Sequence, residues 1–180
     1  MLAVVTVGAL AVGIGVGRTA VPDPGTEARL AVEATALPLA LDADAIWTSG
    51  ALGAPAVAEG IGSLVAGDPS VVGANAAAWL EAHDSVLVRL AGIELPATAR
   101  PVQRQLLNAV ALSRDAVEVL DRAAAVGPGP QRDDLIIEVV RLRQRSEGLL
   151  LAARASVEDL DGAGRRIALP APVPPFPGSP

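Results

Sequence analysis

Three long segments with apolar residues at spacings of three and four most constrain what this 180-residue chain can fold into. They span Asp68–Gly92, Pro101–Val126 and Pro130–Asp161. Asp68 and Pro69 form an N-cap followed by a proline at the first helical position, and the Gly127–Pro130 turn ends one helix and opens the next. A 3.5-residue apolar spacing on helices joined by short turns is typical of a left-handed bundle, and no stretch alternates as a half-buried strand would. The sequence therefore predicts an all-α fold, an antiparallel up-and-down helical bundle.

The apolar spacing also predicts which face of each long helix is buried. In the first helix this face consists of Val72, Ala76, Trp79, His83, Val86 and Leu90. In the second it consists of Val102, Leu106, Ala109, Ser113, Val117, Leu120 and Ala124. In the third it consists of Leu135, Val139, Leu142, Ser146, Leu149, Ala153, Ser156 and Leu160.

A less regular stretch precedes the three long helices and supplies the fourth. Thr26–Trp47 is expected to be a helix bent at Pro38, whose buried side chains are Leu30, Leu37, Leu41 and Trp47. Pro55–Ala66 is expected to be a short helical piece within a glycine-rich connector. The predicted bundle domain spans residues 24–162, and residues 163–180 form a Pro-rich tail that we expect to be disordered.

Residues 1–20 are expected to form an N-terminal signal or membrane anchor. Leu2–Gly17 carries no charged side chain and is followed by Arg18. As a helix, the stretch from Met1 to Gly17 measures roughly 25 Å, near the lower limit for crossing the hydrocarbon core of a bilayer. Cleavage after Thr19 or Ala20 is poorly signalled, which favours an uncleaved single-pass anchor over secretion after cleavage. We expect the domain to lie outside the cytoplasm, although Arg18 alone argues weakly for the opposite orientation.

The composition removes several kinds of chemistry. The chain has no Cys and no Lys, which excludes disulfides, thiolate metal sites and lysine Schiff bases. The net charge of −6 and the scarcity of aromatic residues argue against a nucleic-acid partner. We expect no cofactor, no metal site and no catalytic residues.

The only histidine, His83, is the main candidate for a functional residue, because it lies on the apolar face between Trp79 and Val86. Ser113 and Ser146 lie near the middle of their helices, as His83 does, so the three residues are expected to share one layer. Such a layer commonly fixes the register of a bundle through hydrogen bonds, and this is the favoured interpretation. The alternatives are a small-ligand pocket formed by Trp79, His83, Ser113 and Ser146, or a Ser–His pair. No carboxylate lies at a matching position to orient the imidazole, which argues against catalysis.

These features favour a membrane-tethered or secreted interaction or accessory module over an enzyme. Its expected partners are a membrane, through Leu2–Gly17, and a protein of unknown identity, with a homo-oligomer as a further possibility. A ligand-binding or sensory domain that uses the seam around Trp79 and His83 is the alternative.

Overall fold

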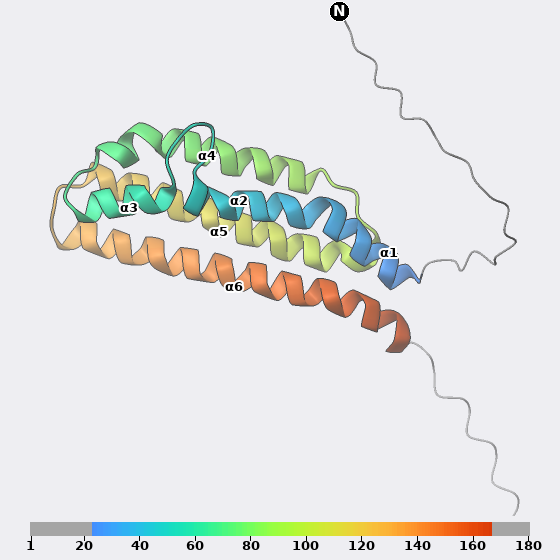
Figure 1. The fold of residues 1–180 in the computed structure, drawn as a ribbon. Coiled ribbons are helices and arrows are strands. Elements are labelled where there is room, and N and C mark those ends of the chain that lie inside the picture. The colour runs from blue at the N-terminus through green and yellow to red at the C-terminus, as the bar shows by residue number, and fades with distance from the viewer. Residues whose placement is uncertain (1–22, 167–180) are drawn as a thin grey trace, which may run out of the picture.

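The computed structural model describes residues 23–166, and every regular element in this range is helical, as the sequence predicts (Figure 1). The long helices are α4 (Ser70–Ala91), α5 (Arg100–Ala125) and α6 (Pro130–Arg166). Helix α6 continues beyond its predicted end at Asp161 to Arg166. A glycine inside a helix costs only about 1 kcal/mol, so the glycines at the predicted boundary do not stop it.

The predicted leader, residues 1–20, and residues 167–180 of the predicted tail lie outside the described residues. Within residues 23–166, none of the helices combines the length and the apolar character that a membrane span requires.

The bent N-terminal helix is built from three consecutive elements. Helix α1 (Pro24–Ala31) passes through a π-helical turn, η1 (Val32–Ala36), into α2 (Leu37–Ser49). Pro38 in the first turn of α2 has no N–H group, so the α-helical hydrogen-bond ladder cannot continue unchanged through this point. The N–H group of Leu37 bonds instead to the carbonyl oxygen of Val32, five residues earlier. A separate short helix, α3 (Val57–Val65), corresponds to the predicted piece in the connector.

The expected burial of Leu30 is wrong, because 52% of this residue is exposed. Leu37 and Leu41 are partly buried, and only Trp47 is fully in the core as predicted. Helix α1 instead buries Gly25 and Ala28. A Cβ atom on Gly25 would overlap the backbone carbonyl of Leu160, so these small residues let α1 approach α6 closely.

Helix α5 lies at the centre of the bundle and contacts α4, α6 and α2. Figure 1 shows α4, α5 and α6 side by side, with each helix running back along the one before it. The connection from α4 to α5 contains a 3₁₀ turn, η2 (Ala97–Ala99). The Nε2 atom of Gln103 on α5 donates to the carbonyl oxygens of Leu90 and Ile93, each at 2.9 Å, and so satisfies one carbonyl group in the last turn of α4 and one in the loop that follows.

Candidate functional site

The four predicted site residues are all buried, and two of their side chains are joined directly. The exposed fractions of Trp79, His83, Ser113 and Ser146 are 0%, 0%, 2% and 4%. The Nε2 atom of His83 lies 3.0 Å from the Oγ atom of Ser113. Its Nδ1 atom lies 2.8 Å from the backbone carbonyl oxygen of Trp79, one turn earlier in α4.

These contacts determine which nitrogen of His83 carries the proton. A carbonyl oxygen can only accept, so Nδ1 must be the N–H donor to Trp79. In the neutral ring Nε2 is then an acceptor, and the hydroxyl group of Ser113 donates to it. Every hydrogen-bonding atom of the imidazole therefore has a partner while the ring is neutral.

Trp47 of α2 completes this arrangement, and sequence reasoning assigned it only to the core. Its Nε1–H group donates to the Oγ atom of Ser113 at 2.6 Å, so Ser113 accepts from Trp47 and donates to His83. We call Trp47, His83 and Ser113 the buried polar layer, which links α2, α4 and α5. No sequence pattern predicts this bond, because the spacing of apolar residues leaves the register of the N-terminal stretch against the long helices open.

Arg143 of α6 extends the buried polar layer to a fourth helix. Its guanidinium group lies over the Trp47 ring, 4.9 Å from the ring centroid, and therefore makes a cation–π contact. The same group forms ion pairs with Asp44 at 2.7 Å and with Glu147 at 2.9 Å. The pair with Glu147 lies within α6, one turn apart, whereas the contacts with Asp44 and Trp47 join α6 to α2.

Ser146 does not join the buried polar layer. Its hydroxyl group donates to the carbonyl oxygen of Ala109 at 2.8 Å and so ties α6 to α5. Ser113 and Ser146 line a common cavity, but its volume is only about 10 Å³. This volume is at the lower limit for a single water molecule and far below that of a small-molecule site.

Trp79 is held by contacts separate from those of the buried polar layer. Its Nε1–H group donates to the carbonyl oxygen of Pro55 at 2.8 Å, and its ring packs against Gly60 of α3. The indole is therefore enclosed by the connector and by α3 and presents no open face to a ligand.

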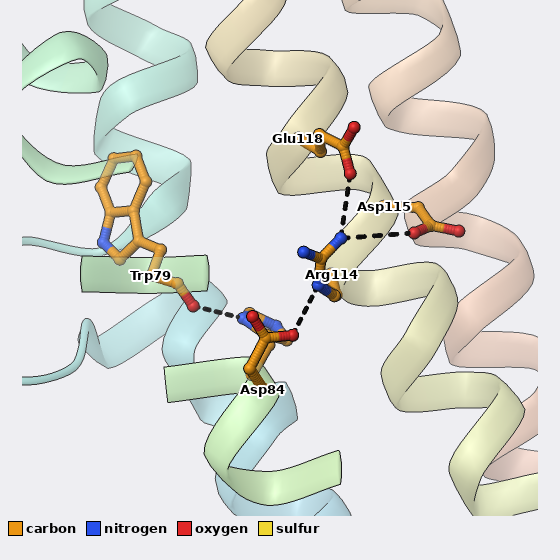
Figure 2. Close-up of polar contacts among 6 residues, drawn as sticks. Trp79, Asp84, Arg114, Asp115 and Glu118 are labelled. Atoms are coloured by element: carbon orange, nitrogen blue, oxygen red, sulfur yellow. Dashed lines mark hydrogen bonds and ion pairs between the residues drawn. The ribbon is translucent and has the colours of Figure 1, made fainter. Parts of the chain in front are cut away.

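A charged cluster around Arg114 lies on the surface (Figure 2), and its member Asp84 directly follows His83 in the chain. Arg114 of α5 reaches Asp84 of α4 at 2.6 Å and Glu118, one turn along its own helix, at 2.9 Å. Asp115 is more distant, at 3.9 Å. All four side chains are at least partly exposed, so solvent screens these pairs and their contribution to stability is small.

Burial is the main reason why the pKa of His83 is lowered from its ordinary value. The hydrogen bond to the Trp79 carbonyl opposes this shift, whereas the positive charges of Arg143 and Arg114 add to it and Asp84 counteracts them. The neutral imidazole that the hydrogen bonds require is thus also the form that the surroundings favour.

We expect the domain to lose stability in acid through His83. Because the pKa is lower in the folded state, the unfolded chain binds the proton more readily, and the free energy of unfolding falls as the pH drops below about 6.5. Above this pH the contribution is fully present. Urea unfolding at several pH values should show this slope in the wild type and its loss in His83→Gln. Identical pH profiles for the two proteins would contradict a buried, neutral histidine.

Comparing two substitutions of His83 should show whether its side chain stabilises the fold by hydrogen bonding or only by filling space. Glutamine supplies both an N–H donor group and a carbonyl acceptor, so His83→Gln can keep both contacts, whereas His83→Leu leaves the Ser113 hydroxyl without its acceptor. We expect His83→Leu to be less stable than His83→Gln by about 1–2 kcal/mol in urea unfolding at pH 8. Equal stability, or greater stability of the leucine variant, would show that the imidazole contributes only volume.

The hydrogen bonds of His83 and Ser113 are arranged as in an activated serine nucleophile, but a substrate has no access to Ser113. A hydroxyl group donates to Nε2 while Nδ1–H is held by an acceptor, as in Ser–His enzymes. Here the Ser113 oxygen is buried and already accepts a hydrogen bond from Trp47, and the neighbouring cavity has no room for a substrate. The geometry thus supports a role in joining helices. Among the described residues, no three His, Asp or Glu side chains are grouped so that they could hold a metal ion.

Comparison of the chain with models of protein families, with curated proteins and with solved structures gives no significant match.

Proposed function

We propose that this protein is an extracytoplasmic interaction or accessory module without catalytic activity. In this proposal an apolar helix at the N-terminus tethers an antiparallel up-and-down bundle to the membrane. The observation that carries the proposal is that the side chains best suited to catalysis are buried and hydrogen-bonded within the core. His83 and Ser113 are buried and bonded to each other, to the Trp79 carbonyl and to Trp47.

The tether is supported by the uncharged stretch Leu2–Gly17, which as a helix would reach across most of the hydrocarbon core of a bilayer. Because the chain has no Cys, its fold does not depend on whether its compartment is reducing or oxidising, so the composition is compatible with export. Secretion after cleavage of the leader remains the alternative form of the same proposal.

The ligand-binding alternative at Trp79, His83, Ser113 and Ser146 draws no support from the packing. Trp79 and His83 are completely buried, and the cavity beside Ser113 and Ser146 measures only about 10 Å³. Binding to another protein would use surface residues and would not require access to these buried side chains.

A reporter enzyme fused after Pro180 tests the location of the domain. We expect a reporter that requires export to be active in the full chain and inactive when Leu2–Gly17 is deleted. A reporter that requires the cytoplasm should give the opposite result. Fractionation then separates the two forms, because an uncleaved anchor stays with the membrane. Activity only of the cytoplasmic reporter in the full chain would overturn the proposal.

A further inference from the structure

An open groove of about 510 Å³ lies between the N-terminal helix and the end of α4. One wall comes from η1 and the start of α2, and the other from the last turn of α4 and the residues that follow it. The apolar part of the lining is formed by Ala34, Pro38, Leu39, Val88 and Ile93. Val88 is 73% exposed, more than any other large hydrophobic residue noted on the described surface.

The groove has little net charge. Asp42 and Arg89 contribute one charge of each sign to its lining, and the other residues there are neutral. A highly charged partner would gain little from such a surface, whereas an uncharged, apolar segment would bury its side chains there without leaving a charge unpaired.

The chain itself contains such a segment in Ile167–Pro180. These residues carry no charged side chain, and six of them are prolines. The segment also holds Leu169, Val173 and the only phenylalanine of the chain, Phe176. These aliphatic and aromatic side chains would gain free energy from burial in an apolar groove. Prolines favour the extended polyproline conformation, which binds in apolar grooves at a low cost in conformational entropy.

The segment starts at the end of the bundle where the groove lies. Arg29 of α1 forms an ion pair with Asp161 of α6 at 2.7 Å, and Figure 1 shows the end of α6 beside the start of α1. Thr35, which lines the groove, is six residues from Arg29, and Arg166 is five residues from Asp161. At about 1.5 Å per helical residue, Thr35 and Arg166 are therefore at most about 17 Å apart along the bundle. Crossing the width of one helix adds about 10 Å. Fourteen residues in the polyproline conformation span about 43 Å, which is enough to reach the groove and lie along it.

We propose that Ile167–Pro180 binds in the groove between η1–α2 and α4 and covers Val88. The segment then acts as an intramolecular occupant that any other protein must displace to use this surface. This inference goes beyond the proposed function, because it holds whichever side of the membrane the domain occupies.

Disulfide trapping in the full chain tests the proposal, and the absence of native cysteines makes every cross-link assignable. The test protein carries Val88→Cys with Phe176→Cys. Its matched control carries Leu30→Cys with Phe176→Cys, because Leu30 is also an exposed apolar residue and adjoins Arg29, close to the start of the segment. A segment that moves freely would reach residue 30 at least as readily as residue 88. Binding in the groove should make the 88–176 disulfide form about tenfold faster or more under mild oxidation at low protein concentration.

A second variant shows whether the groove causes this preference. Ala34 is exposed on the groove wall, so Ala34→Arg should leave the fold intact and lower the 88–176 rate to that of the control. Ala58→Arg places the same charge on an exposed position of α3 and should change nothing. Equal rates for the 88–176 and 30–176 pairs would overturn the proposal. So would an 88–176 rate that Ala34→Arg leaves unchanged, or a single Val88→Cys protein that links instead to a second copy.

Discussion

Replacing Ser113 by alanine is expected to lower the free energy of unfolding by about 2–5 kcal/mol, the largest effect of any single hydroxyl group in the described core. Ser113 is the acceptor for the Trp47 N–H group and the donor to His83, at 2.6 and 3.0 Å. Both partners are buried, so Ser113→Ala leaves a donor and an acceptor unpaired in an environment that water does not reach. An unsatisfied buried group of this kind costs about 1–3 kcal/mol.

Ser146→Ala is the matched control, since it removes an equally buried hydroxyl group from the neighbouring helix. Ser146 donates only to the carbonyl oxygen of Ala109, which also accepts a bond within α5. We expect a loss of about 0.5–1.5 kcal/mol, measured by urea unfolding at pH 8. If Ser113→Ala costs no more than Ser146→Ala, the buried polar layer does not hold the helices together in the way we describe.

Gly60→Ala is expected to destabilise the protein by about 2–3 kcal/mol, although alanine is the better helix former. A Cβ atom at this position would lie 2.7 Å from the Trp79 ring and 3.2 Å from Val72. Both neighbours are completely buried, so neither can move aside without disturbing the rest of the core. The added methyl group therefore pushes α3 away from α4.

Gly62, two residues along the same helix, provides the control. No atom lies within 4 Å of a Cβ atom built there, and the residue is exposed. Gly62→Ala should therefore stabilise the protein by up to about 1 kcal/mol through helix propensity alone. Thermal unfolding of both variants measures the difference. Opposite signs support the close contact of α3 with Trp79, whereas stabilisation by both substitutions would contradict it.

The apolar spacing predicted the buried face of α4 completely. All six residues of the predicted face, from Val72 to Leu90, are buried. Helix α4 packs with one side against its neighbours, so a narrow seam describes it well.

The same reasoning was less complete for the other two long helices. Helix α5 buries its predicted face except Ala124, which is only partly buried. It also buries Val110, Ala116, Val119 and Ala123, because it has neighbours on several sides and a 3.5-residue seam covers only one of them. Leu135, Leu142 and Leu149 of α6 are only partly buried. Helix α6 has its most extensive contacts with α5 and α1 and so retains a wide solvent-facing side.

The candidate site was predicted in part for a related reason. The central positions of His83 and Ser113 in their helices correctly suggested that they meet. Ser146 was expected in the same layer, but it bonds to the carbonyl oxygen of Ala109, and Trp47 is the second side chain that bonds to Ser113. Spacing within one helix fixes which way a side chain faces, but not which residue of another helix lies opposite. That depends on the axial shift of α2, which the π-helical turn before Pro38 alters.

Nitrogen NMR of the His83 ring tests the central claim most directly, because the chain has a single histidine and gives a single assignable imidazole. We predict a neutral ring with the proton on Nδ1, bonded to the Trp79 carbonyl, and Nε2 accepting from Ser113. Its titration should occur below the ordinary pKa of about 6.5. A proton on Nε2 in the neutral ring, or a titration at the ordinary value, would contradict the account of a buried polar layer that joins the helices.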